Sequence, residues 1–165
     1  MRKLNVGCVH LYEYTYWGAT TSNPTADPNP RLEAYIAAAR RGAQARILLD
    51  SVFDDPTDPR GNTATCAYVN ALASTEGLDL GCKLANPTGT GIHNKMVLVN
   101  DGGLGYVHTG SINGSENSSK NNREFAVQVQ SNEAYAYLAG VFWHDWCEYA
   151  VFLPAVLCNC QAPAN

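Results

Sequence analysis

Strand-like and helix-like patterns alternate along the first half of the chain. In order, they predict a strand at 4–17, an amphipathic helix at 31–41, a short apolar strand at 47–49, a helix at 62–75 and a strand at 78–85. Strands joined through a helix normally lie parallel in one sheet, with the helix packed on its face. The strand at 47–49 has no polar face, which is typical of a central strand covered on both sides. The alternation therefore predicts an α/β domain.

A hairpin follows these units. The apolar run 96–99 leads into Asn-Asp-Gly-Gly-Leu-Gly and then into a second β-like run that ends at Gly110. Consecutive glycines between two such runs are a strong hairpin signal, because glycine adopts the positive φ that tight turns need. Two more elements complete the pattern, a strand at 125–129 and a helix at 133–149. We expect a single domain over 1–165, of the α/β class, with a mixed β-sheet of about six to eight strands sandwiched between helices.

Four polar side chains border the hairpin. A turn centred on Gly103 places His93 opposite Asn113, and the same register places Lys95 opposite Ser111. Directly opposed side chains have Cβ atoms about 5 Å apart, so an imidazole, an amide, an ammonium and a hydroxyl converge on one patch. This set suits an anion better than a metal ion, because the lysine repels cations and a carboxylate cluster is missing.

The same residues carry a resemblance to a known family. The order His93-x-Lys95, a four-residue apolar run, a polar position and Gly110-Ser111-x-Asn113 resembles the HKD motif of the phospholipase D superfamily. The similarity covers roughly residues 4–150. It includes Asn122-Arg123-Glu124 before the strand at 125–129, the helix at 31–41 with its exit through 42–49, and the aromatic segment 142–146. The chain departs from the pattern at Asn100, which holds the family's aspartate position, and in a turn longer by three residues.

The resemblance implies an α/β/α fold and metal-independent phosphodiester hydrolysis or phosphatidyl transfer through a phosphohistidine, of the phospholipase D or endonuclease type. It implies that His93 is the nucleophile or general acid, that Lys95 and Asn113 bind phosphate with help from Ser111, and that Glu124 orients His93. The chemistry is consistent, because an imidazole is a competent nucleophile, preorganised donors stabilise developing negative charge, and a carboxylate fixes the histidine tautomer. No metal or other cofactor is expected.

The general acid that protonates the leaving oxygen is supplied in this family by a second copy of the motif. The chain carries one copy, because His10, His108 and His144 lack the following x-Lys. The expected partner is therefore a second HKD motif, from a homodimer mate or from a missing N-terminal half. The departure at Asn100 motivates an alternative, a non-catalytic half-domain that binds phosphate or anionic lipid head groups. A zinc- or disulfide-stabilised structural module is a third reading.

Composition limits the range of substrates and partners. The formal net charge is −4 and charged residues make up 16% of the chain, against about 25% in an average protein. No basic stripe of the kind that grips nucleic acid is visible beyond Arg40-Arg41. A phospholipid or a nucleic acid held at one phosphodiester remains the expected substrate. No apolar run approaches the ~20 residues of a membrane-spanning helix.

Six cysteines, at 8, 66, 82, 147, 158 and 160, show no C-x-x-C spacing of the kind that holds structural zinc. We expect disulfides, with Cys66–Cys82 joining a helix to a strand and Cys147 pairing with Cys158 or Cys160. Free thiols in a cytoplasmic protein are the alternative. Disulfides indicate an extracytoplasmic or secreted protein, whose targeting signal would lie outside this chain because Met1 leads directly into a strand.

Overall fold

The computed structural model describes residues 5–11, 14, 16, 23–148 and 150–151. These residues form one sheet with the strand order β6-β5-β4-β1-β2-β3-β7. Its seven strands are β1 (Asn5–Leu11), β2 (Ala45–Asp50), β3 (Leu80–Ala85), β4 (Lys95–Asp101), β5 (Leu104–Gly110), β6 (Ala126–Gln130) and β7 (Ala150–Val151). β1, β2 and β3 are parallel, and the other neighbouring pairs are antiparallel. The predicted mixed sheet is confirmed.

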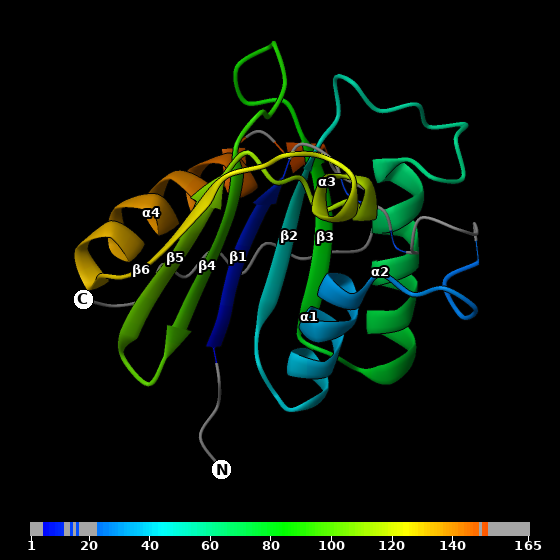
Figure 1. Cartoon of the computed structure of the whole chain (residues 1–165). Helices are drawn as coiled ribbons and strands as arrows, with labels where there is room; N and C mark the ends of the chain where they lie inside the picture. The colour runs from blue at the N-terminus through cyan, green and yellow to red at the C-terminus, as the bar shows by residue number, and fades with distance from the viewer. Residues whose placement is uncertain (1–4, 12–13, 15, 17–22, 149, 152–165) are drawn as a thin grey trace.

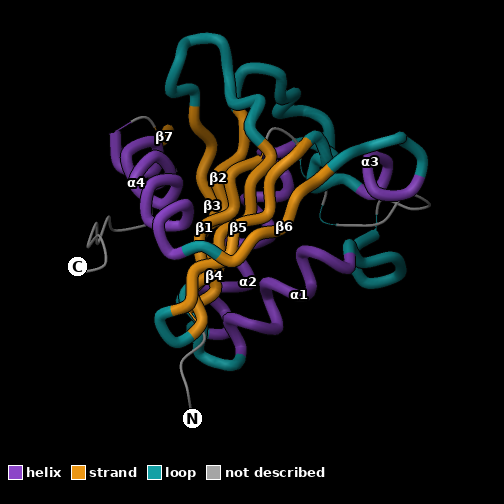
Figure 2. The backbone as a smooth tube through the Cα atoms, turned by 60° about the vertical axis from the view of Figure 1, so that its left-hand side comes forward, coloured by secondary structure: helices purple, strands orange, loops and turns teal. Residues whose placement is uncertain are grey.

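Helices cover both faces of the sheet. α1 (Pro30–Arg40) and α2 (Asn62–Glu76) lie on one face, α4 (Asn132–Glu148) lies on the other, and the short α3 (Glu116–Lys120) lies near one end, as Figures 1 and 2 show. Each layer has its own apolar cluster. Ile47 and Leu49 of β2 belong to the cluster with α1 and α2, whereas Leu48 packs with α4. This alternation confirms that β2 is a central strand buried on both faces, and that the order of layers is α/β/α.

The ends of α1 follow from local chemistry. The side-chain oxygen of Asn29 accepts hydrogen bonds from the backbone N–H groups of Arg31 (3.0 Å) and Leu32 (3.3 Å). Pro30 occupies the first helical position, where a missing N–H costs nothing. Gly42, with φ of +91°, then turns the chain toward β2. The helix predicted at 31–41 is thereby confirmed.

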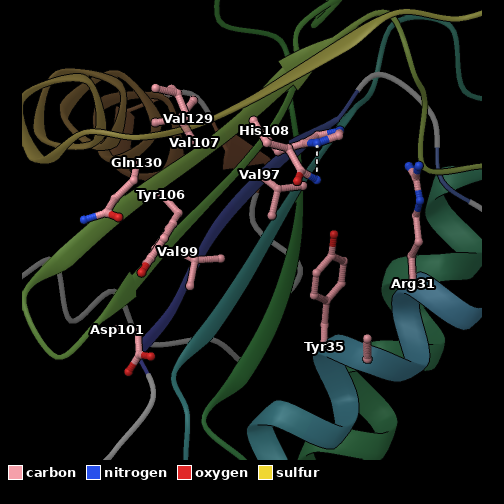
Figure 3. Close-up of a pocket in the computed structure, with 12 residues that line it drawn as sticks. Arg31, Tyr35, Val97, Val99, Asp101, Tyr106, Val107, His108, Val129 and Gln130 are labelled. Atoms are coloured by element: carbon pink, nitrogen blue, oxygen red, sulfur yellow. Dashed lines mark hydrogen bonds between the residues drawn. The ribbon is translucent and has the colours of Figure 1, made fainter.

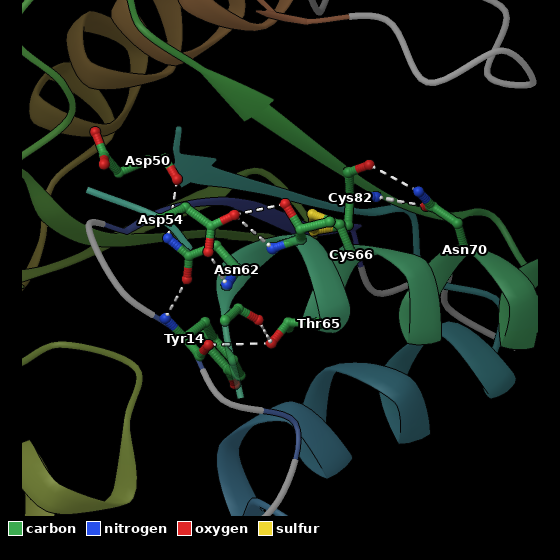
Figure 4. The surroundings of a disulfide bond; sticks show 10 residues. Tyr14, Asp50, Asp54, Asn62, Thr65, Cys66, Asn70 and Cys82 are labelled. Atoms are coloured by element: carbon green, nitrogen blue, oxygen red, sulfur yellow. Dashed lines mark hydrogen bonds between the residues drawn. A yellow bond between two sulfur atoms is a disulfide. The ribbon is translucent and has the colours of Figure 1, made fainter. Parts of the chain in front are cut away.

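Of the strand predicted at 4–17, β1 covers Asn5–Leu11, Tyr14 and Tyr16 belong to no strand, and residues 4, 12–13, 15 and 17 lie outside the described residues. Tyr14 is fully buried and its backbone bonds to α2 instead of a neighbouring strand. Its N–H donates to Asn62 Oδ1 (2.9 Å), and its carbonyl accepts from Thr65 Oγ1 (3.0 Å), as Figure 4 shows. Side chains of α2 therefore hold the backbone of Tyr14 in place.

Two acidic residues between the apolar part of β2 and the start of α2 hold backbone groups in place. Asp50 is fully buried at the end of β2. Asp54 accepts hydrogen bonds from the backbone N–H groups of Asn62 (2.6 Å) and Thr63 (3.1 Å). These N–H groups at the start of α2 have no partner within the helix, so Asp54, which precedes the helix in the loop, acts as its N-terminal cap.

A disulfide joins Cys66 of α2 to Cys82 of β3, as predicted (Figure 4). Beside it, the Asn70 side chain donates to the carbonyl of Cys82 (3.0 Å) and accepts from its N–H (2.9 Å). Cys147 is also disulfide-bonded, and its expected partners at 158 and 160 lie outside the described residues. The covalent bond and the amide together fix α2 on the outer part of the sheet. In the described part of the chain, no helix is long and apolar enough to cross a membrane.

Candidate active site

The predicted site residues gather at one end of the sheet. Lys95 is the first residue of β4, and Gly110 is the last residue of β5. Glu124 lies two residues before β6, which pairs with β5 so that Ala126 faces Gly110. Because β4 is antiparallel to β1, its first residue lies at the end where the parallel strands β1, β2 and β3 finish. Ligands of open α/β sheets normally bind at this end.

The predicted hairpin register was wrong by one residue. Lys95 pairs with Gly110 rather than with Ser111, and Asp101 pairs with Leu104. The turn consists of Gly102 and Gly103 alone, with φ of +60° and +93°. Such a two-residue turn has no central residue, so the register shifts relative to a turn centred on one glycine. The pleat of the hairpin therefore does not place Lys95 opposite Ser111, nor His93 opposite Asn113.

Strand pairing with β6 nevertheless brings Ser111 to Glu124. The Ser111 N–H donates to the carbonyl of Phe125 (2.9 Å), and the Phe125 N–H donates to Ser111 Oγ (3.1 Å). The Ser111 hydroxyl in turn donates to the Glu124 carboxylate, whose other oxygen accepts from Asn122 Nδ2 (3.1 Å). The serine hydroxyl thus continues the β5–β6 ladder and fixes the position of the carboxylate.

The pKa of Glu124 is lowered, first by the hydrogen bond from Ser111 and then by that from Asn122, with a smaller contribution from the charge of Lys95. The carboxylate is therefore ionised at neutral pH and lies within electrostatic reach of the Lys95 ammonium. Lys95, Ser111 and Glu124 therefore lie near one another at this end of the sheet.

Lys95 also connects this group to His93. The Lys95 residue is only 5% exposed, and its Nζ donates to the main-chain carbonyl of His93 at 2.7 Å. The His93 residue itself is exposed. One residue earlier, the N–H of Ile92 donates to Oδ1 of Asp50 at 2.6 Å, while Oδ2 of Asp50 accepts from the N–H of Phe53 at 2.7 Å. A buried carboxylate therefore anchors the segment that carries His93.

Sequence reasoning missed Asp50. Its signal was its place directly after a wholly apolar central strand, at the end of the sheet where sites occur. Gly91 belongs to the same anchor, since it adopts φ of +93° and a Cβ there would fall on the Asp50 carboxylate. The Asp50 carboxylate occupies the space that a side chain at position 91 would need, so this position requires glycine. The chain then passes directly to His93.

Asn113 approaches the site from the loop after β5. Its Oδ1 atom is buried and accepts no hydrogen bond from the described residues. Its main-chain carbonyl accepts from Arg31 Nη1 (3.2 Å), and the next carbonyl, that of Gly114, accepts from Asn29 Nδ2 (2.9 Å). Gly114 packs so closely on the Tyr14 ring that it leaves no space for a Cβ. The start of α1 therefore positions this loop, a role that the sequence did not reveal.

A pocket of about 660 Å³ lies between α1 and the exposed face of the hairpin (Figure 3). Arg31 and Tyr35 line it from α1, and Val97 lines it from β4. His108 of β5 also lines it and is hydrogen-bonded to Gln128 (3.2 Å). Burial, and then the charge of Arg31, lower the pKa of His108, so this imidazole is neutral at neutral pH. Among the described residues, no three His, Cys, Asp or Glu side chains are grouped so that they could hold a metal ion.

Comparisons with solved structures agree with the fold. No curated protein matches the sequence. The structure is similar to NucT from Helicobacter pylori, with a TM-score of 0.63 and 16% identity, over 88% of this chain and 80% of that chain. It is also similar to Nuc from Salmonella typhimurium, a phospholipase D family member, with a TM-score of 0.54 and 18% identity, over 84% of this chain and 78% of that chain. At these identities the likeness shows the fold.

The family follows from the sequence itself. Residues 16–146 match the family model described as the cardiolipin synthase, phospholipase D-like domain. The matched segment contains both strands of the hairpin, the loop of Asn113 and the strand that follows Glu124. With the shared fold and the grouping of Lys95, Ser111 and Glu124 at one end of the sheet, this match shows that the chain belongs to the phospholipase D superfamily.

Proposed function

We propose that the chain is a metal-independent phosphodiesterase that hydrolyses or transfers a phosphodiester through a phosphohistidine on His93. The observation that carries the proposal is the grouping of Lys95 and Glu124 beside the His93 segment in a member of this family. Lys95, Ser111 and Asn113 bind the phosphate, and Glu124 orients the imidazole. Hydrogen bonds from Ser111 and Asn122 hold Glu124 in its ionised form, which suits a group that stabilises an imidazolium.

The proposed reaction has two displacements. A ring nitrogen of His93 attacks phosphorus, the bond from phosphorus to the leaving oxygen breaks, and a general acid protonates that oxygen. Water or an alcohol then attacks the phosphohistidine, gives up its proton and releases His93. Negative charge builds on the phosphoryl oxygens in both steps, where the Lys95 ammonium and neighbouring donors stabilise it.

The departure at Asn100 does not touch this chemistry. Asn100 lies five residues from Lys95 on β4, which is about 17 Å along a strand. Its Oδ1 accepts from the N–H of Gly103 (3.1 Å) in the hairpin turn. An asparagine performs this structural role as well as an aspartate does, which favours the catalytic proposal over the non-catalytic phosphate- or anionic-lipid-binding half-domain.

We propose that a second HKD motif, from a homodimer mate or from another part of a longer protein, completes the site. Exposed aromatic residues flank the site on both sides and support a covering surface. Phe53 is 65% exposed beside Gly91, and Phe125 is 72% exposed directly after Glu124. Large exposed apolar side chains in one region mark contact surfaces. The Cys66–Cys82 disulfide supports an extracytoplasmic location for the protein.

The first test compares wild type with His93→Ala in the hydrolysis of bis(p-nitrophenyl) phosphate, after light scattering has given the oligomeric state. Removal of the nucleophile should lower kcat by at least ~10³-fold, and circular dichroism should stay unchanged. His144→Ala, an exposed histidine on α4, is the matched control and should retain activity. Equal activity in wild type and His93→Ala would contradict the mechanism.

A mixing experiment tests the second motif if the chain dimerises. Equal amounts of wild type and inactive His93→Ala, allowed to exchange subunits, should lose about half the activity of the wild-type chains, because only one dimer in about four keeps two histidines. Unchanged activity would show that one motif suffices. Binding of vanadate by a dimer without any turnover would instead support the non-catalytic alternative.

A further inference from the structure

Among the described residues, one edge of the sheet is open. β6 is the outermost strand at the side opposite β7, and β5 is its neighbour (Figures 1 and 2). The Ser111 N–H of the β5 side donates to the Phe125 carbonyl, and the Ser131 N–H donates to the last strand's Gly105 carbonyl. Odd-numbered residues along β6 therefore direct their backbone groups toward β5. The outward N–H and C=O groups belong to Ala126, Gln128 and Gln130.

This edge has none of the features that keep edge strands from pairing. β6 reads Ala-Val-Gln-Val-Gln, without a charged residue or a proline. Its pairing with β5 runs through five consecutive residue pairs without a bulge. All of its residues are at least partly exposed. Edge strands normally carry lysine, proline, a bulge or a covering element, so an uncharged and uncovered one is a template for a further strand.

Apolar side chains gather beside this edge. Val127 and Val129 are each 45% exposed. Val129 pairs with Val107, which packs in the apolar cluster of α4, and residues two apart on a strand share a face. Both valines therefore lie on the α4 face of the sheet, beyond the part that the helix covers.

α4 extends this apolar surface. Its Trp146 lies against Gly81 of β3, on the far side of the sheet from β6. With 3.6 residues per turn, Tyr137 and Val141 lie on the opposite flank of the helix, toward β6. Both are exposed. The two valines of β6 and these two residues of α4 thus form one apolar strip along the open edge.

The size of the surface fits an interface between two proteins. The four apolar residues have exposed fractions between 37% and 74%, and the side chains of Gln128 and Gln130 are exposed as well. Together they present roughly 500 Å² per chain, on the basis of about 150–250 Å² for a large side chain. Two copies would bury roughly 1,000 Å² of side-chain surface, which a specific interface needs.

Two β6 strands are complementary to each other in one antiparallel register. With a two-fold axis at Gln128, this residue faces Gln128 of the second copy. The outward groups of Ala126 then meet those of Gln130, and each of these N–H and C=O groups has a partner. Val127 meets Val129 on the α4 face. The register therefore joins apolar to apolar residues and brings no two charges together.

We propose that the β6 edge binds the β6 edge of a second copy of this chain, which joins two sheets into one, with the α4 helices side by side over the apolar strip. This interface differs from one that supplies a second HKD motif. Glu124 lies four residues from the axis at Gln128, so the two proposed sites are about 27 Å apart along the strands. They cannot share a phosphate, and the proposal does not rest on the proposed function.

Disulfide trapping tests the register. Antiparallel residues that exchange hydrogen bonds have Cα atoms about 5.5 Å apart, which a disulfide spans. Gln128→Cys in the whole chain should therefore give a covalent dimer on a non-reducing gel after mild oxidation, whereas oxidised wild type should not. Gln130→Cys is the matched control, an exposed glutamine of the same strand and face. Its two copies would lie about 14 Å apart and should not cross-link.

A charge in the strip tests the apolar contact. Val129→Lys should raise the dimer dissociation constant at least ~10-fold in sedimentation equilibrium, because the buried ammonium would lack a partner. Leu104→Lys is the matched control, since Leu104 is also 45% exposed but lies on the opposite face of the sheet from Val107. It should leave the constant unchanged, and circular dichroism should show that both variants fold.

Three results would overturn the proposal. Absence of the Gln128→Cys dimer would do so, and would leave the edge for a strand from a different protein. Equal cross-linking of Gln128→Cys and Gln130→Cys would do so as well, because no single register gives both. The third is a dissociation constant that Val129→Lys leaves unchanged.

Discussion

Replacing Asp50 with alanine removes the anchor of the His93 segment. Asp50 is fully buried and accepts hydrogen bonds from two backbone N–H groups, those of Ile92 (2.6 Å) and Phe53 (2.7 Å). The Ile92 donor is itself buried, so it has no ready replacement partner in Asp50→Ala. We expect the variant to be less stable and to hold His93 less firmly.

The magnitude follows from these two bonds. A hydrogen bond to a charged group contributes about 1.5–3 kcal/mol, so two contribute about 3–6 kcal/mol. The lower part of this range applies, because Phe53 is exposed and water can reach its N–H. We therefore expect the free energy of unfolding to fall by about 3–4 kcal/mol, which lowers Tm by about 10 °C in a chain of this size. Asp50→Asn keeps one acceptor oxygen and should lose about half as much.

Urea denaturation followed by tryptophan fluorescence measures this change. Asp58→Ala is the control, because Asp58 is exposed and its carboxylate accepts from the N–H of the nearby residue Arg60 (2.7 Å). It should change the free energy of unfolding by less than ~1 kcal/mol. An Asp50→Ala variant as stable as Asp58→Ala would refute the reasoning, since the buried Ile92 N–H would then have cost nothing to leave unpaired.

Three further predictions test other parts of the fold. Replacing both Cys66 and Cys82 with alanine should lower the free energy of unfolding by about 3 kcal/mol, as measured in urea, because the bond closes a loop of 16 residues. Gly110→Ala should cost about 1–3 kcal/mol in the same assay, since a Cβ would fall on the β6 backbone; Gly140→Ala in α4, where the space is open, should instead be neutral or stabilise by up to ~1 kcal/mol. A carbon-13 NMR titration should place the pKa of Glu124 below that of an ordinary glutamate, chiefly because the Ser111 hydroxyl donates a hydrogen bond to its carboxylate. Its contribution to stability should be complete above the ordinary pKa and disappear as the pH falls through the lowered one, and an unshifted titration would contradict the hydrogen-bonded geometry.

The elements of the fold were predictable because each has a distinct period. The apolar run 47–49 with helices on either side specified parallel strands, and the Gly102-Gly103 pair specified a hairpin. Both signals are local, so tertiary packing did not have to be known. The same local signals indicate that Lys95, Gly110 and Glu124 lie at one end of the sheet, because each of them lies at or next to the end of a strand.

The register and the anchors were not predictable from the same signals. Asp-Gly-Gly is compatible with turns of two or three residues, and only pairing across the hairpin decides that both Gly102 and Gly103 adopt positive φ. Asp50 follows its strand as a first loop residue would, and its burial depends on Ile92, 42 positions later in the chain. A contact of this kind leaves no periodic trace in the sequence.

The position of the His93 segment does not depend on the hairpin turn. Three hydrogen bonds hold the His93 segment near the end of the sheet. The Gly91 N–H donates to Asn86 Oδ1 (2.9 Å), the Ile92 N–H donates to Asp50 Oδ1, and the Lys95 ammonium donates to the His93 carbonyl. None of them involves the hairpin turn, which lies about 20 Å from Lys95 along β4. On the other strand, pairing of β5 with β6 places Ser111 and Glu124 independently. Changes at the turn should therefore affect stability but not the geometry of the proposed catalytic groups, whereas changes at the Asp50 end of the sheet should affect both.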